Sequence, residues 1–438
     1  MQTLEQLKSG QLIGRKRLQL VEGLTVFPHE IFELADTLEV LDLSNNQLDA
    51  LPADFGRLKK LKILFLSNNQ FKHLPVELGD CPDLEMIGFK ANQIKQVAEA
   101  SLPKKTRWLI LTENQIEQLP DSMGQLHRLK KLALAGNRLT SLPDSMADCQ
   151  NLELVRLSAN QLTHLPDWLL QLPKLSWLAF AGNPIGKKTP CQNSKVPHVS
   201  LADIEISQQI GEGASGVISK ARWINQPASL MGSDLDIAVK VFKGEVTSDG
   251  YPRDELANCL KAGEHSNLIK VVAQITEADT LALVMELIPS TFYNLGLPPT
   301  LVTCTRDTFK EGSQYLPSEV AKVALQMADM LAHLHQNGVS HGDVYAHNTM
   351  IDDTASVLFG DFGAASNLCL LPVDQQVMME AVEVRAFGCL LDDLLTLAQS
   401  DKPIELFSVL VELKDQCMAA DMTSRPTFNN IVRRLHAL

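Results

Sequence analysis

Seven asparagines recur through the first half of the chain at an almost constant spacing. Each closes a Leu-x-x-Leu-x-Leu-x-x-Asn frame, and successive frames are offset by 23 residues, with one offset of 22: Asn46, Asn69, Asn92, Asn114, Asn137, Asn160 and Asn183. A period of about 20 to 30 residues indicates a solenoid, in which each repeat buries its apolar side only against its neighbours. The first half of the chain is therefore predicted to be a stack of repeats that offers a binding surface.

The spacing within one frame predicts its local structure. In the frame that starts at Leu38, the pair Leu41 and Leu43 predicts a short strand whose alternate residues point into the core. The side chain of Asn46 can bond to the backbone where the chain leaves the strand, so stacked asparagines would form a ladder. The frames resemble the leucine-rich repeat family, of the short type with Leu-Pro in the second half, over roughly residues 16 to 186. The resemblance implies an α/β solenoid in which these leucines and asparagines are scaffold.

Other residues of each strand point away from the core, onto the concave face of such a solenoid. Phe65 and Ile110 lie there, with Trp108 and Trp177 at a neighbouring strand position, and together they are more apolar than a solvated face requires. We expect Phe65, Trp108 and Ile110 to bind a protein partner. The alternative is that they are scattered apolar surface residues, which are common and need no explanation.

Composition limits the class of protein. The chain has 438 residues, and single domains rarely exceed about 250 to 300 residues, so we expect two domains. The net charge of −13 and the lack of a dense run of Lys or Arg argue against a nucleic-acid partner. The N-terminus, Met1–Lys8, lacks the apolar stretch of a secretory signal, and no run of about 18 apolar residues predicts a membrane span. Eight cysteines without a Cys-x-x-Cys pair indicate reduced thiols, so we expect a cytoplasmic protein.

The repeat pattern stops near residue 187, and residues 187–203 carry polar residues and Pro without periodicity, which predicts a linker. The segment Ile210-Gly-Glu-Gly-Ala-Ser-Gly-Val-Ile218 follows. Its three glycines would let the backbone fold closely over phosphates with its N–H groups exposed: Gly211, Gly213 and Gly216. A glycine pattern of this kind is weak on its own, because plain turns also match it.

A lysine and an acidic residue strengthen this interpretation. Lys240 ends the strand-like run Ile237-Ala-Val-Lys240, where its ammonium group could neutralise phosphate oxygens. Helical spacing then places Glu255 as a partner that would orient Lys240, with Asp254 as the alternative. A lone lysine at the end of a strand is usually solvated, so the assignment depends on the motifs that follow.

Two aspartate motifs carry the chemistry. In His341-Gly-Asp343-Val-Tyr-Ala-His-Asn348, Asp343 would accept or orient the proton of an attacking hydroxyl, and Asn348 could reach back to a metal ion. Asp361, in Asp361-Phe-Gly363, supplies a carboxylate for Mg²⁺, which takes few protein ligands. Each acid alone could be a surface charge or a helix cap. Their order and spacing together indicate a phosphotransferase.

From about residue 202 to the C-terminus, these motifs resemble the protein kinase family. The segment Glu383-Val-Arg-Ala-Phe-Gly388 is similar to the Asp-x-Trp-x-x-Gly helix of kinases, with Glu in place of Asp. The resemblance implies an α+β, two-lobed protein kinase-like domain over residues 204–438, with an N-lobe to about residue 288 and a C-lobe from about residue 289. With a leucine-rich repeat domain over residues 1–186, the layout looks like the intracellular leucine-rich-repeat protein kinases of bacteria.

The resemblance also implies a cofactor and its contacts. ATP would bind with Mg²⁺, or with Mn²⁺ as an alternative metal, and Asn348 and Asp361 would hold that metal. Lys240, Asp343 and Asn348 would be the catalytic residues. Besides the three glycines, Lys240 and Glu255, the nucleotide would contact a further set of residues: Ile218, Ala238, Met285, Glu286, Ile288 and Met350.

Several positions depart from the kinase pattern. Gly342 replaces the Arg that grips an activation-loop phosphate in most kinases, and residues 364–383 contain one hydroxyl residue, Ser366, so we expect no activation by loop phosphorylation. Tyr345 stands where Ser/Thr kinases typically have Lys, which leaves the acceptor residue open. His-Gly-Asp is also common in small-molecule kinases of the superfamily. A small-molecule phosphotransferase and a nucleotide-binding pseudokinase scaffold therefore remain as alternatives, while Asp-Phe-Gly and the repeat domain favour a protein kinase.

Overall fold

The chain folds into two compact units. The computed structural model describes residues 2–186, 196–213, 215–232, 236–244, 246–247, 249–399 and 404–438. By their contacts, Met1–Leu175 and Asn183–Ile185 form the first unit, and Ser176–Gly182 and Gly186–Leu438 form the second. The predicted linker lies outside the described residues up to residue 195. The short segment Ser176–Gly182 belongs to the repeat pattern by sequence but to the second unit by its contacts.

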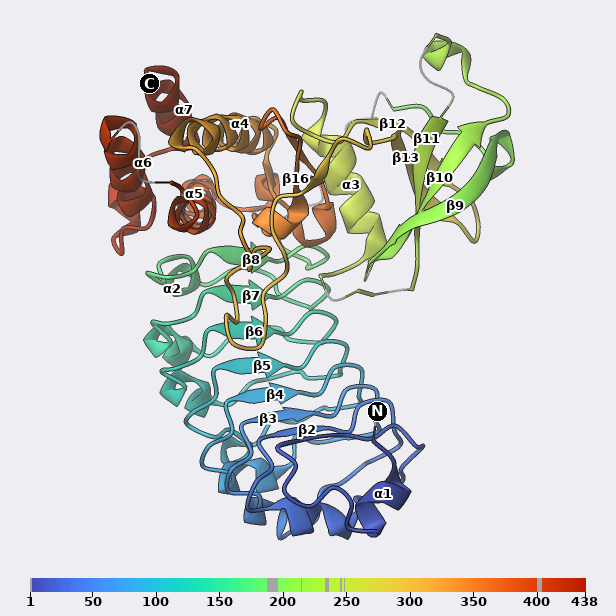
Figure 1. Ribbon diagram of the computed structural model, residues 1–438, viewed down its shortest axis with the longest axis vertical. Coiled ribbons are helices and arrows are strands. Elements are labelled where there is room, and N and C mark those ends of the chain that lie inside the picture. The colour runs from blue at the N-terminus through green and yellow to red at the C-terminus, as the bar shows by residue number, and fades with distance from the viewer. Residues whose placement is uncertain are drawn as a thin grey trace. The chain divides into compact units, whose positions relative to one another are not determined.

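The repeats form a sheet of eight short strands in chain order (Figure 1). The strands are β1 (Arg17–Gln19), β2 (Val40–Asp42), β3 (Ile63–Phe65), β4 (Met86–Gly88), β5 (Trp108–Ile110), β6 (Lys131–Ala133), β7 (Leu154–Arg156) and β8 (Trp177–Ala179). Neighbours from β1 to β7 pair in parallel, so the central residue of each strand lies opposite the central residue of the next. These central residues are fully buried, as expected for the second leucine of each frame.

Helical turns return the chain between the strands of the repeats. They are α1 (Leu4–Lys8), η1 (His29–Leu34), η2 (Phe55–Arg57), η3 (Val76–Asp80), η4 (Glu99–Ser101), η5 (Asp121–Gln125), η6 (Asp144–Asp148) and α2 (Asp167–Leu170). The one repeat of 22 residues keeps its strand in register, because Met86 pairs with Trp108. Since Gln96 still bridges to His73 at the ordinary offset, the missing residue lies between Gln96 and Trp108, in the stretch that contains η4.

The predicted asparagine ladder is present. The side-chain oxygen of Asn114 accepts a hydrogen bond from the Ile94 N–H (2.9 Å), and its amide nitrogen donates to the carbonyls of Phe89 (2.9 Å) and Leu111 (3.0 Å). Each amide thereby satisfies backbone groups of its own repeat and of the preceding one. Those backbone groups are buried and therefore need hydrogen-bond partners. The asparagine side chains supply these partners, which apolar side chains could not do.

The second unit begins with an antiparallel sheet in the order β12-β13-β11-β10-β9. Its strands are β9 (Ile204–Glu212), β10 (Gly216–Trp223), β11 (Asp236–Phe242), β12 (Val271–Thr276) and β13 (Leu281–Glu286), with η7 (Leu201–Asp203), η8 (Ala228–Leu230) and α3 (Pro252–Ala262) beside them. The alternation of strand residues buries Val239, Ile275 and Val284 on one face. On the other face Leu256 of α3 packs against Phe242 and Leu283, which fixes the helix to the sheet.

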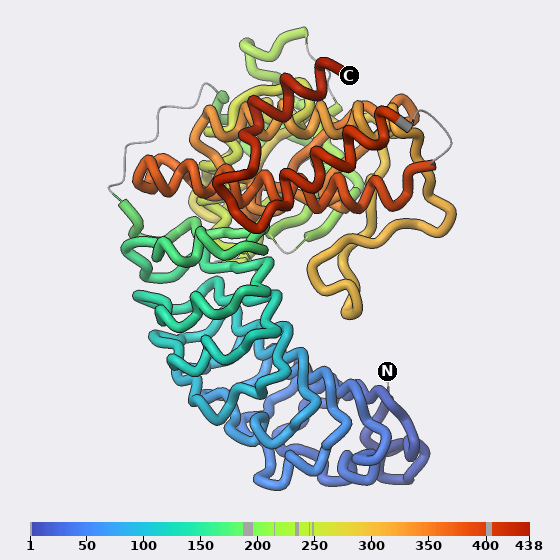
Figure 2. Tube along the Cα trace, turned by 90° about the vertical axis from the view of Figure 1, so that its left-hand side faces the viewer, coloured from blue at the N-terminus to red at the C-terminus, as the bar shows by residue number. Residues whose placement is uncertain are grey.

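The rest of the second unit is mainly helical, and Figure 2 shows its long helices lying together in orange and red. They are α4 (Pro317–Gln336), α5 (Val373–Thr396), α6 (Ile404–Cys417) and α7 (Phe428–His436). Two small sheets accompany them, β14 (Tyr293–Asn294) with β16 (Thr349–Ile351) and β17 (Val357–Phe359), and β15 (Val339–Ser340) with β18 (Ser366–Asn367). Short helices fill the loops: η9 (Ala346–Asn348), η10 (Phe362–Ala364), η11 (Leu368–Leu370) and η12 (Met422–Ser424).

The predicted fold class is confirmed, with a parallel repeat sheet followed by an antiparallel sheet and a helical part. Helix α4 ends at Gln336, and Gly338 follows shortly after it with a φ of +68°, a conformation that favours glycine. In the described part of the chain, every helix is too short or too polar to span a bilayer.

Candidate active site

Lys240 and Glu255 meet inside the second unit. Lys240 lies on β11 and Glu255 in the first turn of α3, and the ammonium group donates a hydrogen bond to the Glu255 carboxylate. Of the two acidic residues considered from the sequence, Glu255 is the one that makes this contact. Both residues are buried, with 8% and 4% of their surface exposed. Because a buried charge needs a partner, each side chain holds the other in place.

The charges around Lys240 keep it protonated. Burial lowers the pKa of Lys240, but the carboxylates of Asp361 and Glu255 outweigh burial and raise the pKa above its ordinary value. Asp361 Oδ1 lies 3.7 Å from the ammonium nitrogen. Strand β11, helix α3 and the Asp-Phe-Gly segment therefore converge on one positive charge.

The loop after β15 positions Asp343 and Asn348. The amide nitrogen of Asn348 donates to Asp343 Oδ2 (2.7 Å) and to the Asp343 backbone carbonyl (3.1 Å). With the nitrogen engaged in this way, the amide oxygen of Asn348 is the group suited to a cation. The short helix η9 turns the chain at Ala346–Asn348 and so brings Asn348 back to Asp343.

Asp361 has an unusual backbone conformation. Its φ is +61°, in the left-handed region, which costs about 1–3 kcal/mol for a residue other than glycine. Its carboxylate accepts a weak bond from the Gly363 N–H (3.4 Å) and is 57% exposed. Strain of this kind persists where the surrounding structure imposes it, and here it turns an exposed carboxylate toward Lys240.

A buried histidine links the two aspartate motifs. The His341 ring packs at a tilt against Phe359 (4.3 Å between centroids) and Phe362 (5.3 Å), and its Nε2 lies 3.0 Å from the carbonyl oxygen of Gly360. His341 and Phe362 are both buried. The position of Asp343 is therefore coupled to that of Asp361 through packed rings.

Glu383, on α5, also holds the loop that carries Asp343. Its carboxylate accepts hydrogen bonds from the Gly342 N–H (2.6 Å) and the Ser340 hydroxyl (3.3 Å), and it pairs with His335 Nε2 (2.6 Å). Burial raises the pKa of Glu383, but the hydrogen bond and charge of His335 outweigh it and lower the pKa. The sequence marked Glu383 as a motif residue. It gave no signal for His335, which belongs to no motif.

A second pair fixes the far end of the loop. Asp307 accepts hydrogen bonds from the His347 N–H (3.0 Å) and pairs with His347 Nδ1 (2.7 Å). Burial lowers the pKa of His347, but the hydrogen bond and charge of Asp307 outweigh burial and raise it. Asp307 stands in a segment without periodicity or motif, so the sequence analysis missed it.

The glycine segment joins β9 and β10. The Gly213 N–H donates to the carbonyl of Gly216 (3.0 Å), which closes the turn. A Cβ at Gly216 would lie 2.5 Å from the carbonyl oxygen of Val241, so no side chain fits there, whereas nothing lies within 4 Å of a Cβ at Gly213. Gly211 lies opposite Ile218 in the sheet. The open space at Gly213 suits a ligand that approaches the backbone.

The remaining predicted nucleotide contacts follow the sheet. Ile218 lies opposite Lys240, and Ala238 lies opposite Met285, so three of them lie on the neighbouring strands β10, β11 and β13. Glu286 is the last residue of β13, Ile288 lies just beyond it, and Met350 lies on β16. The N–H of Glu286 is already bonded to the carbonyl of Lys270 (3.0 Å), so only its carbonyl could meet a base.

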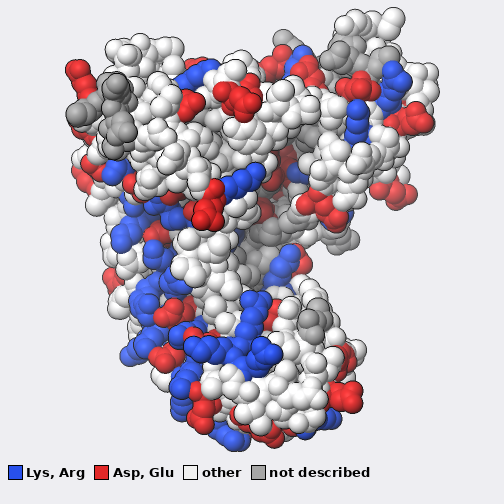
Figure 3. Space-filling view, in the orientation of Figure 1, with Lys and Arg blue, Asp and Glu red and all other residues white. Residues whose placement is uncertain are grey.

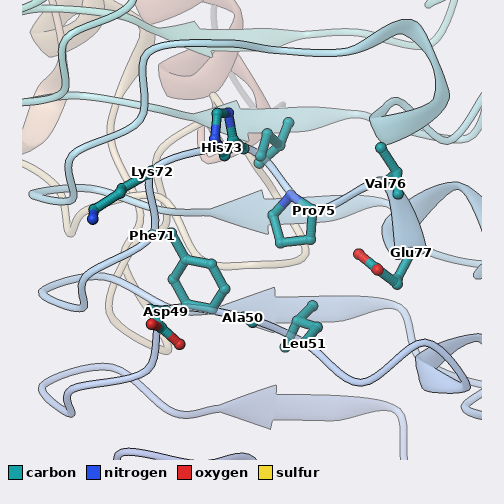
Figure 4. A pocket seen from close by; sticks show the side chains of 10 residues that line it. Asp49, Ala50, Leu51, Phe71, Lys72, His73, Pro75, Val76 and Glu77 are labelled. Carbon is teal, nitrogen blue, oxygen red and sulfur yellow. The ribbon is translucent and has the colours of Figure 1, made fainter.

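Figure 4 shows a pocket that belongs to the repeats, not to these residues. It is lined by Asp49–Leu51 and Phe71–Glu77. None of the predicted catalytic or nucleotide-contact residues lines it. The candidate active site is therefore defined by the contacts around Lys240 and Asp343.

Two protein families match parts of the chain. Residues 204–382 match the family described as protein tyrosine and serine/threonine kinase, and two pairs of overlapping stretches match the leucine-rich repeat family: residues 23–71 with 36–94, and 104–162 with 127–185. These matches do not bear on the predicted bacterial type of the layout.

Individual relatives are distant. A probable serine/threonine-protein kinase of Dictyostelium discoideum is 25% identical over 173 residues, which are 39% of this chain and 11% of that protein. A second one from the same organism is 24% identical over 278 residues, 55% of this chain and 28% of that protein. A serine/threonine-protein kinase of Arabidopsis thaliana is 24% identical, over 40% of this chain and 28% of its own length. The chain thus spans less than a third of these relatives. A solved leucine-rich-repeat protein of Leptospira interrogans is 26% identical over 42% of this chain and 53% of its own, with a TM-score of 0.36.

Proposed function

Because the chain combines a leucine-rich repeat region with a protein kinase domain, we propose that it transfers the γ-phosphoryl group of ATP to a protein hydroxyl. The observation that carries the proposal is the joint presence of two contacts, Lys240 with Glu255 and Asn348 with Asp343. A phosphotransferase depends on placing charged groups around the phosphates more than on covalent chemistry. Each of these two contacts fixes the position of side chains that would surround the phosphates.

The residues that would hold the metal fit Mg²⁺. Asp361 offers a carboxylate and Asn348 an amide oxygen, which are the hard oxygen donors that Mg²⁺ prefers. Bound Mg²⁺, or Mn²⁺ in its place, would neutralise phosphate charge.

Each site residue then has one role. Lys240, protonated by its acidic neighbours, would bind phosphate oxygens of ATP, and Glu255 would orient it. Asp343 would accept the proton of the incoming hydroxyl. The glycine segment would cover the phosphates with backbone N–H groups, and Ile218, Ala238 and Met285 would border the base. Glu286, Ile288 and Met350 would also contact the nucleotide.

Two observations weaken the alternatives. A pseudokinase scaffold would need no assembled lysine, aspartate and asparagine set, yet this chain has all of them. The His-Gly-Asp sequence, which suggested a small-molecule kinase, has a local steric reason. Gly342 has a φ of +73°, and a Cβ there would lie 2.7 Å from the carbonyl oxygen of Ala364. Glycine at position 342 therefore carries no information about the acceptor.

For the repeats we propose a protein partner on the concave face. Phe65, Trp108 and Ile110 are partly buried, and the ammonium group of Lys131 lies 4.4 Å from the centre of the Trp108 ring. Figure 3 shows Lys and Arg side chains gathered over the repeats, with acidic ones among them. An apolar centre with a charged rim is the arrangement that protein interfaces favour.

We also propose a cytoplasmic location. The cysteines in the described residues are free thiols, most of them buried, and burial raises the pKa of Cys81 to about 12 and of Cys149 to about 11. Inert thiols of this kind suit a reducing compartment. Thiol labelling with and without reductant in cell extracts would test this, since disulfides found without reductant would contradict it.

One experiment tests the enzymatic proposal. The full-length protein is incubated with γ-labelled ATP, Mg²⁺ and a peptide library that contains Ser, Thr and Tyr. Label on peptide or on the protein itself, lost in Asp343→Asn, is the expected result. Turnover only with a small alcohol or aminoglycoside would favour the small-molecule kinase, and no nucleotide binding would favour the scaffold.

A second experiment tests the partner face. Phe65→Asp, Trp108→Asp and Ile110→Asp should each abolish capture of the partner while leaving the thermal midpoint nearly unchanged, because the leucine ladder does not need these residues. Unfolding of these variants would contradict the proposal.

A further inference from the structure

The segment Ser176–Gly182, the last strand of the repeat pattern, is built into the candidate active site. Trp177 is 1% exposed, and its indole N–H donates to the carbonyl oxygen of Val344 (3.0 Å), the residue after Asp343. The indole also stacks on the ring of Tyr345, with centroids 4.5 Å apart and planes 7° from parallel. The Tyr345 ring in turn lies 4.9 Å from that of His347. One tryptophan therefore holds the middle of the loop that carries Asp343.

The same segment also holds the residues after Asp-Phe-Gly. The Phe180 N–H donates to the hydroxyl of Ser366 (2.9 Å), the one hydroxyl residue of that stretch. At Gly342 a Cβ would lie 2.8 Å from the carbonyl oxygen of Leu178. The backbone of the segment thus passes where an arginine at position 342 would begin, so the strand and the arginine exclude each other.

A third contact reaches helix α3. A Cβ at Gly182 would lie 2.6 Å from the ring of Tyr251 and 2.7 Å from a carboxylate oxygen of Asp254, so the backbone packs directly on the start of the helix. Asn258, further along α3, donates to the carbonyl of Ala365 (2.7 Å). Since α3 carries Glu255, the segment touches the helix, the loop and the post-Gly363 stretch whose mutual placement assembles the site.

We propose that Trp177 is a positioning residue for phosphoryl transfer, and that Ser176–Gly182 replaces the arginine–phosphate pair as the element that orders the site. This inference rests on the proposed kinase activity. Where loop phosphorylation is used, a new Arg–phosphate pair orders the segment. Here the buried indole and three backbone contacts, at Leu178, Phe180 and Gly182, supply that order permanently, so the kinase domain is functionally complete only with the last repeat strand.

The test uses full-length Trp177→Ala and Trp177→Phe. The matched control is Trp168→Ala on α2, which removes a partly buried tryptophan whose indole N–H donates to Asp144 (3.1 Å), outside the candidate active site and the proposed partner face. Phosphoryl transfer to the peptide library is measured with γ-labelled ATP. The maximal rate is divided by the concentration of ATP sites found by calorimetry, which gives kcat per ATP site. We expect Trp177→Ala to lower kcat by at least about tenfold with KM for ATP within about twofold, because small misplacements of reacting groups reduce rate far more than binding. Trp177→Phe, which keeps the stack but loses the N–H bond, should lie between, and Trp168→Ala should match the wild type.

This normalisation separates positioning from folding. A purely structural role for Trp177 would reduce the number of ATP sites and leave kcat per site unchanged, and that result would overturn the proposal. If Trp177→Ala does not fold, kcat per ATP site is measured in Trp177→Phe and in Ser366→Ala, which removes only the bond to Phe180. A lower kcat per site in these variants supports positioning, and an unchanged value overturns it.

A second readout is independent of catalysis. Amide hydrogen exchange of residues 342–349 and 364–367 should accelerate in Trp177→Ala and Trp177→Phe but not in Trp168→Ala, since exchange reports local opening. If the wild type binds Mg-ATP but transfers no phosphate, the proposed function fails, and unchanged exchange in the Trp177 variants would then refute the positioning role separately.

Discussion

Replacing Gly342 by alanine should destabilise the second unit more than its backbone conformation alone explains. A Cβ in the left-handed region costs about 1–2 kcal/mol. At Gly342 the added carbon would also lie 2.7 Å and 2.8 Å from two backbone carbonyl oxygens, those of Ala364 and Leu178, which cannot swing aside as a side chain would. Forcing such a contact costs about a further 1–3 kcal/mol.

Gly312 provides the matched control for Gly342. Its φ is +81°, but nothing lies within 4 Å of the Cβ that alanine would add. Gly312→Ala should therefore lose about 1–2 kcal/mol, whereas Gly342→Ala should lose about 2–5 kcal/mol. Gly342→Arg, which restores the residue common in kinases, should be at least as destabilising as the alanine.

Urea unfolding of the full-length variants, followed by amide exchange in α4 and α5, measures these losses in the unit that contains both glycines. Equal losses for Gly342→Ala and Gly312→Ala would show that the two carbonyls move away easily. The steric explanation of the His-Gly-Asp sequence would then be wrong, and the small-molecule alternative would regain its support.

Three further predictions concern charge and hydrogen bonds. Asp343→Asn should bind Mg-ATP normally while Asp361→Asn loses most metal-dependent affinity, and equal affinities by calorimetry with and without Mg²⁺ would contradict these roles. Asn114→Ala should lower the free energy of unfolding of the repeats by about 1–3 kcal/mol in urea, because it leaves the buried Ile94 N–H without a partner, whereas the carbonyls of Phe89 and Leu111 keep their bonds from Asn92 and Asn137; a loss within error would contradict the ladder. His347→Gln should lose more stability at pH 6 than at pH 9. The folded pKa of His347 is raised, so its contribution is complete below its ordinary pKa of about 6.5 and disappears as pH rises through the folded pKa; a pH-independent loss would refute this.

The repeats could be predicted almost completely from the sequence because their contacts are local. Each strand pairs with the repeat 23 residues away, so period alone sets the register, and the buried leucines and asparagines follow from it. The order of the kinase motifs likewise predicted the two-lobed fold. Patterns that repeat or cluster along the chain can be recognised without knowing which distant residues are in contact.

Contacts between remote segments could not be predicted. Trp177 was placed on a partner surface by its repeat position, yet it is buried against residues 167 positions away. Asp307 and His335 support the loop that carries Asp343 from segments without motifs. Glu255 and Asp254 are neighbours in sequence that point about 100° apart on a helix, so only the packing of α3 decides which one meets Lys240.

The repeat that is one residue short shows where this scaffold accepts changes in length. Between Gln96 and Trp108 a residue is missing, yet the strands on either side pair without a slip. The stretch around η4 has therefore absorbed a deletion that a strand could not, because a slip of one residue there would turn the buried leucines outward. That stretch is the natural place for an inserted peptide tag or fluorophore attachment, which would report on the repeats while leaving the sheet and its concave side chains in place.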